Sequence, residues 1–179
     1  PNVWIGSSVV NQEEADRDIP KLLATPAAKR FVSYEPALGP IDFHHWVSKI
    51  FVDGGGYHGQ LPTLDWVIVG GESDQGGVKA RPFRRHWADN IVRQCKAAKV
   101  PVFVMQMGSN VIDRNDAGFD GCDPAAWPLT PDGCDPDVQH DIYDFQEEYQ
   151  GADCRVKLRD RHGANPAEWP FDLRVQEFP

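Results

Sequence analysis

The sequence predicts an α/β fold built from successive strand–helix units. Four apolar segments, residues 3–9, 30–33, 66–69 and 100–105, recur at a spacing of roughly 30 residues, which is the length of one such unit. The segments are apolar in runs, as is typical of parallel strands buried on both faces. Amphipathic segments lie between them. Four units make either half of an eight-stranded barrel or a small open sheet, and the pattern leaves both open.

The segment between the first two strands predicts a helix. Asn11 is placed to cap it, and Glu14 follows three residues later, close to a capping-box arrangement. Thr25-Pro26 ends it. One face of this helix would be apolar and would pack on the strands, through Ala15, Ile19, Leu22 and Leu23.

Two further helices are expected. Asp42 can cap a short helix that carries Trp46, Val47 and Ile50. The third strand leads to a longer helix whose inner face would hold Trp87, Ile91, Cys95 and Ala98, which makes Cys95 a core residue. Between these helices, residues 54–62 indicate a flexible insertion before the third strand.

Charge divides the chain near residue 110. Residues 1–110 carry 12 Lys+Arg against 11 Asp+Glu, a net charge of +1, and residues 111–179 carry 6 against 16, a net charge of −10, which together give the −9 of the chain. We expect 1–110 to form the strand–helix part and 111–179 to form an irregular acidic lobe with a C-terminal tail that packs on it. Its near-neutral charge leaves the first part able to bind phosphate locally.

Cysteine use and hydropathy indicate the setting. No apolar run approaches the ~20 residues of a membrane helix, and four cysteines without close pairing favour a reducing, cytoplasmic compartment. Cys122, Cys134 and Cys154 could contribute to a zinc site, but no Cys-x-x-Cys pair is present and turn-forming loops are favoured. We therefore predict no metal ligands. Because the first residue is Pro1 rather than Met, we expect a longer protein.

Polar residues follow each of the four predicted strands, and these are the candidate binding residues. Because the carboxyl ends of parallel strands meet at one edge of a sheet, the polar residues there predict a ligand pocket. The first strand contributes Ser7, Ser8 and Asn11, the second Ser33 and Glu35, the third Gly70, Gly71 and Glu72, and the fourth Gln106.

Each candidate also has a structural interpretation. Glu35 could cap backbone N–H groups, accept a hydrogen bond from a ligand amine or act as a general base. Gly70-Gly71 permits close approach of a ligand to the backbone, or a plain turn. Arg81 is the binding candidate of the basic segment 79–86, since arginine contacts carboxylate or phosphate through two bonds.

A family resemblance rests on motifs that occur in order along the chain. They are Pro1-Asn2-Val3-Trp4-Ile5-Gly6, Asn11-Gln12, Phe31-Val32-Ser33, Glu35-Pro36, Leu38-Gly39-Pro40, Asp65-Trp66-Val67-Ile68-Val69-Gly70-Gly71-Glu72-Ser73, Ala80-Arg81-Pro82, Gln94-Cys95, and the ending from Leu158-Arg159-Asp160-Arg161 to Glu177-Phe178-Pro179. The chain resembles, nearly end to end, a phage and prophage protein family of uncharacterised function. That family is similar to radical S-adenosylmethionine enzymes of the spore photoproduct lyase type.

The resemblance implies a partial TIM-type barrel of which this chain is the C-terminal half. The missing N-terminal half would carry a cysteine motif for a [4Fe–4S] cluster. Six residues would line the S-adenosylmethionine and substrate side, namely Ser7, Ser8, Glu35, Glu72, Arg81 and Gln106. Relatives often have Lys before the strand-four Gln and Trp after it, whereas this chain has Met105-Gln106-Met107, which puts substrate contacts there in doubt.

Three functions follow as hypotheses. The first is the C-terminal half of a radical S-adenosylmethionine-like enzyme, with a nucleic acid or nucleotide as the substrate considered. The second is a non-catalytic phage-encoded binding module that retains the barrel, since this chain lacks the cysteine motif. A metal-dependent hydrolase using Glu35 and Glu72 ranks last, because no histidine is well placed with them. A half-barrel alone should expose strand edges and apolar surface, which predicts a partner fragment, self-association or marginal stability.

Overall fold

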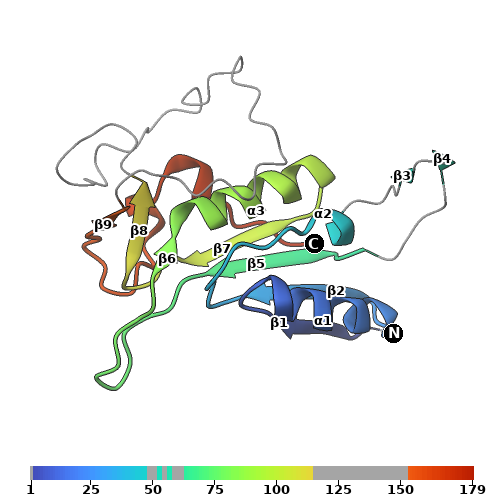
Figure 1. The fold of residues 1–179 in the computed structure, drawn as a ribbon, viewed down its shortest axis with the longest axis horizontal. Coiled ribbons are helices and arrows are strands. Elements are labelled where there is room, and N and C mark those ends of the chain that lie inside the picture. The colour runs from blue at the N-terminus through green and yellow to red at the C-terminus, as the bar shows by residue number, and fades with distance from the viewer. Residues whose placement is uncertain (1, 48–51, 54–55, 58–62, 115–152) are drawn as a thin grey trace, which may run out of the picture.

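The computed structural model describes residues 2–47, 52–53, 56–57, 63–114 and 153–179 (Figure 1). Its main sheet has four parallel strands in the order β1 (Trp4–Ser8), β2 (Lys29–Tyr34), β5 (Trp66–Gly70) and β7 (Val102–Gln106). These are the four strands that the apolar segments predict. The sheet is open, and the described residues show no barrel.

Three helices pack on one face of this sheet: α1 (Gln12–Ala24), α2 (His44–Val47) and α3 (Arg85–Ala98). Strand order follows chain order, so right-handed connections place each helix on the same side. In α3, Ile91 and Cys95 are buried, whereas Trp87 and Ala98 are partly buried. Ile50 lies outside the described residues. Between α2 and β5, the described residues form a small antiparallel pair, β3 (Val52–Asp53) and β4 (Gly56–Tyr57).

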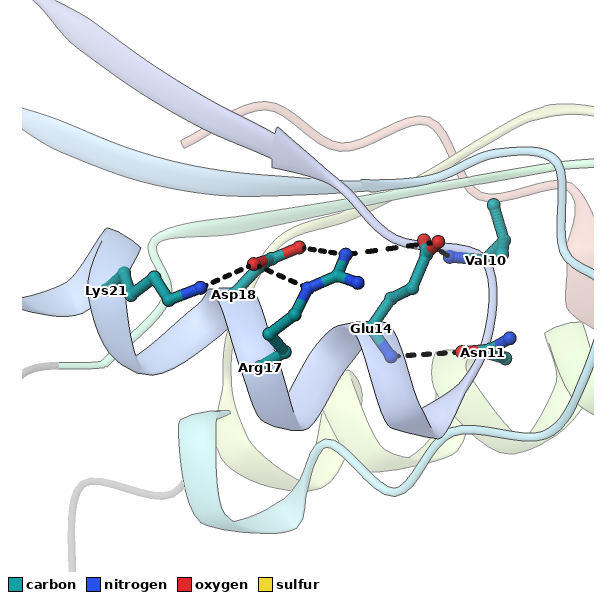
Figure 2. Close-up of polar contacts among 6 residues, drawn as sticks. All are labelled: Val10, Asn11, Glu14, Arg17, Asp18 and Lys21. Carbon is teal, nitrogen blue, oxygen red and sulfur yellow. Dashed lines mark hydrogen bonds and ion pairs between the residues drawn. The ribbon is translucent and has the colours of Figure 1, made fainter.

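Figure 2 shows the start of α1. The side-chain oxygen of Asn11 accepts the Glu14 N–H at 3.0 Å, and Glu14 Oε2 accepts the Val10 N–H at 3.1 Å. The predicted cap is therefore confirmed, with the carboxylate reaching one residue before the usual capping-box partner. Farther along, Asp18 lies between Arg17 and Lys21 on the solvent side, where such pairs add little stability.

A second sheet lies beyond the carboxyl ends of the main strands (Figure 1). It consists of β6 (Phe83–Arg84), β8 (Val111–Arg114) and β9 (Asp153–Val156), with β8 parallel to β6 and antiparallel to β9. The 3₁₀ turns η2 (Pro166–Glu168) and η3 (Phe171–Leu173) follow, and Trp169 and Leu173 enter the core. The described part of 111–179 thus contributes two strands of this sheet and a C-terminal tail, and the irregular acidic lobe stays a prediction. Residues 115–152, which hold its acidic centre, lie outside the description.

The C-terminal tail covers the outer edge of β7. The Val104 N–H donates to the Val175 carbonyl at 2.8 Å, and the Glu177 N–H donates to the Val102 carbonyl at 3.0 Å. This antiparallel pairing satisfies groups that an edge strand would otherwise expose. Phe178 then packs on Trp66, with ring centroids 5.5 Å apart.

The sheet face opposite the helices is aromatic toward the amino ends of its strands. Trp66 packs against Phe31, Phe103 and Trp4, with ring centroids 5.7, 6.2 and 6.3 Å away. Trp4 and Met105 on this face are 46% and 42% exposed. Within the described residues, the outer edge of β1 pairs with no strand. The predicted exposure of apolar surface and of a strand edge is therefore found. As for membrane spans, no described helix has the length and apolar character needed to cross a bilayer.

Candidate functional site

Three adjacent strands bring polar groups together at the carboxyl end of the main sheet. Gln106, at the end of β7, donates from Nε2 to Glu35 Oε1 at 3.2 Å and to the Gly71 carbonyl at 2.8 Å. Glu35 follows β2, and its carboxyl group lies over Gly70, where a Cβ atom would be only 3.0 Å from Glu35 Oε1. The structure thus gathers Glu35, Gly70, Gly71 and Gln106.

Glu35 is a half-buried acid with unused acceptor capacity. Burial raises the pKa of its carboxyl group, and the Gln106 hydrogen bond offsets part of that rise. Gln106 contacts one carboxylate oxygen, and Oε2 accepts no hydrogen bond from a described residue. A carboxylate of this kind can accept a hydrogen bond from a ligand ammonium or amine, or can exchange a proton with it.

The two serines of β1 lie on opposite faces of the main sheet, because side chains alternate along a strand. Ser8 is in register with Ser33, and Ser33 alternates onto the same face as Glu35, opposite the helices. Ser7 is in register with buried Val32 and lies on the helix side. Ser8 and Ser33 therefore share a face with Glu35, and Ser7 does not.

Asn11 has a structural task as the cap of α1. Its side-chain oxygen is already engaged by the Glu14 N–H, as Figure 2 shows. Its Cβ would lie 3.4 Å from a Cβ placed on Gly39, so it also packs against the loop after β2. These contacts account for an asparagine here without a ligand.

Glu72 and Arg81, both predicted to face a ligand, bind each other. Glu72 Oε2 accepts the Arg81 backbone N–H and Nε–H, and Oε1 accepts Nη2–H, all at 2.9 Å. The hydrogen bonds from Arg81 lower the pKa of the Glu72 carboxyl group. The pair closes the base of residues 72–82, which project from the sheet edge in Figure 1.

The tip of this arm is a tight turn. Gly76 and Gly77 have φ of 56° and 84°, and a backbone bridge joins Gln75 to Val78. Positive φ at two successive positions is the glycine-favoured geometry of a two-residue turn. Because Val78 at the tip is 71% exposed, the arm presents an apolar side chain to solvent.

The protein's own packing requires glycine at Gly71 and leaves little room for a larger residue at Gly70. A Cβ on Gly71 would overlap the Met107 carbonyl, and a Cβ on Gly70 would press on Glu35. Neither residue has positive φ. The close approach at Gly71 is therefore made by the chain's own backbone, and approach of a ligand there stays a prediction.

Sequence reasoning missed the contribution of the C-terminal segment to this edge. Gly163 accepts the Met107 N–H at 2.8 Å through its carbonyl, and a Cβ on Gly163 would overlap the Gly108 backbone. Asp160 holds the turn by accepting the His162 and Ala164 N–H groups at 3.0 and 2.9 Å. The available signal was an Asp followed three residues later by Gly, which is typical of a turn.

Metal ligands do not gather within the described residues. No three His, Cys, Asp or Glu side chains there lie close enough to hold an ion. Cys95 is buried in α3 as predicted, and burial raises the pKa of its thiol to about 12. Of the three cysteines considered for zinc, Cys122 and Cys134 lie outside the described residues. The described residues therefore offer no ligand set for an iron–sulfur cluster.

Comparison with known families gives one match. A family described as "Protein of unknown function (DUF5131)" matches residues 1–166. The chain belongs to this family. No curated protein and no solved structure matches it.

For this DUF5131 chain, the nine predicted binding residues fall into two groups. Glu35, Gly70, Gly71 and Gln106 meet at the sheet edge, with Ser8 on the same face. The remaining four lie on the other face of the sheet, cap a helix or pair with each other, and they are Ser7, Asn11, Glu72 and Arg81. The candidate site is therefore centred on Glu35.

Proposed function

We propose that this chain is the C-terminal half of a radical S-adenosylmethionine-like protein and forms one wall of its S-adenosylmethionine and substrate pocket. The observation that carries the proposal is the meeting of Glu35, Gly70, Gly71 and Gln106 at the carboxyl ends of three adjacent parallel strands. In α/β folds this edge is where ligands bind.

Three features of the open sheet support the proposal of a partial TIM-type barrel. Its strands run in chain order, its helices cover one face, and its other face holds aromatic side chains beside the edge of β1, with which no described strand pairs. Further strands could extend the sheet from β1 and cover the aromatic face. These features support a larger protein in which a missing N-terminal half, or a partner fragment, completes the barrel.

Glu35 would orient the ligand through its ammonium group. The carboxylate is half-buried, where a charge-assisted hydrogen bond is stronger than in water, and Gln106 fixes one of its oxygens. Ser8 and Ser33 on the same face could accept or donate further hydrogen bonds. When bound, S-adenosylmethionine supplies the carbon–sulfur bond whose reductive cleavage starts radical chemistry.

The ligands of the [4Fe–4S] cluster would lie in the missing N-terminal half. The described residues offer no ligand set for it. A nucleic acid or nucleotide substrate, a phage origin and a cytoplasmic location are further parts of the proposal that rest on the resemblance.

A non-catalytic binding module is the second candidate. It is favoured by the absence of cluster ligands among the described residues and by the strand-four rim, where Met107 is buried and Gln106 is engaged by Glu35 and Gly71. Such a module would keep the fold and bind a ligand without cleaving it.

The two candidates differ in one product. Full-length protein, reconstituted with iron and sulfide without oxygen and supplied with a reductant, should convert S-adenosylmethionine to 5′-deoxyadenosine if the first is right. The gene sequence upstream of Pro1 should then encode a three-cysteine motif. A cluster-loaded protein that forms no 5′-deoxyadenosine, or an upstream sequence without that motif, would leave the binding module as the better account.

A further inference from the structure

A cavity of about 350 Å³ lies beside the second sheet, between β8, β9 and the turn that follows β7. This volume is within the usual range for a small-molecule site. Its wall combines backbone at Gly108 and Ser109, apolar side chains and three cations. The lining residues are Gly108, Ser109, Val111, Arg155, Val156, Lys157, Leu158, Asp160 and Arg161.

Within the part of the chain that the structure describes, the three cations make few contacts. Arg155, Lys157 and Arg161 are exposed, and none forms an ion pair with a described carboxylate. Arg155 makes one long contact, from Nη2 to the Ser109 carbonyl at 3.5 Å, and Arg161 donates from Nε to His162 at 2.8 Å. Among the described residues, several guanidinium N–H groups and the Lys157 ammonium therefore have no acceptor of their own and could bind a ligand.

The carboxylate that lines this cavity, Asp160, already accepts hydrogen bonds from the backbone. Asp160 accepts the backbone N–H groups of His162 on one oxygen and of Ala164 on the other. It therefore holds its own turn, and its single charge does not balance three cations. Like charges gathered in a partly enclosed space favour an anion.

Cations and apolar residues of the cavity wall alternate along one segment of the chain. From residue 155 to 161, cations occupy the odd positions, while Val156 is buried and Leu158 is half-buried at even ones. Val156 is in register with Val111 on β8, which fixes β9 by its apolar side. Arg155 and Lys157 flank Val156 along the chain and are exposed, and all three residues line the cavity.

We propose that this cavity binds the phosphate groups of a nucleotide or of a nucleic-acid strand. Two guanidinium groups match the geometry of phosphate oxygens, Lys157 adds a point charge, and the apolar wall of Val111, Val156 and Leu158 suits a sugar or base. None of the residues that line this cavity belongs to the group around Glu35. The phosphate site is therefore distinct from the proposed S-adenosylmethionine pocket.

The test is fluorescence anisotropy with a labelled single-stranded oligonucleotide, with ATP and inorganic phosphate as separate competitors. The double variant Arg155→Gln/Lys157→Gln should bind the oligonucleotide about tenfold more weakly or worse. Because two phosphate contacts are lost, the slope of log K against log salt concentration should also become less steep by about 1.4. A matched control, Arg93→Gln/Lys96→Gln, removes two exposed cations from α3 and should bind as the wild type does. The charge-preserving Arg155→Lys/Lys157→Arg should retain most of the binding.

The competitors identify the source of the phosphate. Displacement by ATP at concentrations where inorganic phosphate fails indicates a nucleotide, and displacement by unlabelled oligonucleotide alone indicates a strand. Equal losses in the two double variants, or no binding of any of the three probes by wild type, would overturn the proposal. Glu35→Gln should leave phosphate binding unchanged. Failure of the phosphate proposal can therefore be distinguished from failure of the S-adenosylmethionine proposal.

Discussion

Three carboxyl groups surround the guanidinium group of Arg85 at the start of α3, and this cluster predicts an unusual pH dependence of stability. Arg85 Nε lies 3.3 Å from Asp89 Oδ2, Nη1 lies 3.3 Å from Asp113, and Nη2 lies 3.6 Å from Asp172. Burial raises the pKa of Asp89 to about 8. Arg85 opposes that rise, while a hydrogen bond with Asp172 adds to it. Asp89 is therefore protonated in the folded chain at neutral pH and ionised in the unfolded chain.

The direction in which stability changes with pH follows from the number of protons bound by the folded and unfolded states. Between the unfolded pKa near 4 and the folded pKa near 8, the folded state holds one more proton than the unfolded state, so Asp89 makes stability fall as pH rises. The slope is about 1.4 kcal/mol per pH unit. From about pH 6 to about pH 7.5 the loss is about 2 kcal/mol, or about 4–8 °C in Tm for a chain of this size.

Scanning calorimetry of the wild type and of Asp89→Asn at the two pH values isolates this effect. The amide cannot titrate but can still donate to Asp172. The wild-type Tm should therefore fall by about 4–8 °C relative to the variant as the pH is raised. Asp16→Asn, on the exposed side of α1, corrects for the loss of one negative charge. Parallel pH curves for the wild type and Asp89→Asn would refute the reasoning.

Three further predictions concern contacts inside the fold. Gln94→Leu should lower the free energy of unfolding by about 1–3 kcal/mol in urea titrations, because the buried Phe43 N–H loses its acceptor at 2.7 Å; an unchanged midpoint would contradict this. Gly71→Ala should destabilise the chain more than an ordinary surface change, since its Cβ would overlap the Met107 carbonyl, and a wild-type melting curve would count against that contact. Glu72→Gln should change stability by less than about 1 kcal/mol but speed proteolysis within residues 72–82, and cleavage at the wild-type rate would argue against a clamp.

Much of the main sheet could be predicted from the sequence because each of its strands is a short apolar run. Glu35 and Gln106, about 70 residues apart, were expected to meet because both follow such runs, and parallel strands bring their ends together. The cap of α1 was accessible because Asn11 and Glu14 have fixed spacing.

The remaining features depend on pairings that local sequence does not encode. β6 has two residues and β8 has four, and β8 pairs with β9 only after a long intervening segment. Glu72 and Arg81 each suit a ligand, and nothing in the sequence indicates that the arm folds back to join them. Strand parity could have excluded Ser7, since Ser8 and Ser7 cannot lie on one face.

Equilibrium binding of S-adenosylmethionine by titration calorimetry tests the central claim that Glu35 anchors the candidate site. Full-length wild-type protein should bind it, and Glu35→Gln should bind about 10–100-fold more weakly, as expected for loss of a charge-assisted hydrogen bond. Glu13→Gln, an exposed carboxylate in the first turn of α1, should bind as the wild type does. Equal affinities for wild type and Glu35→Gln would contradict the account.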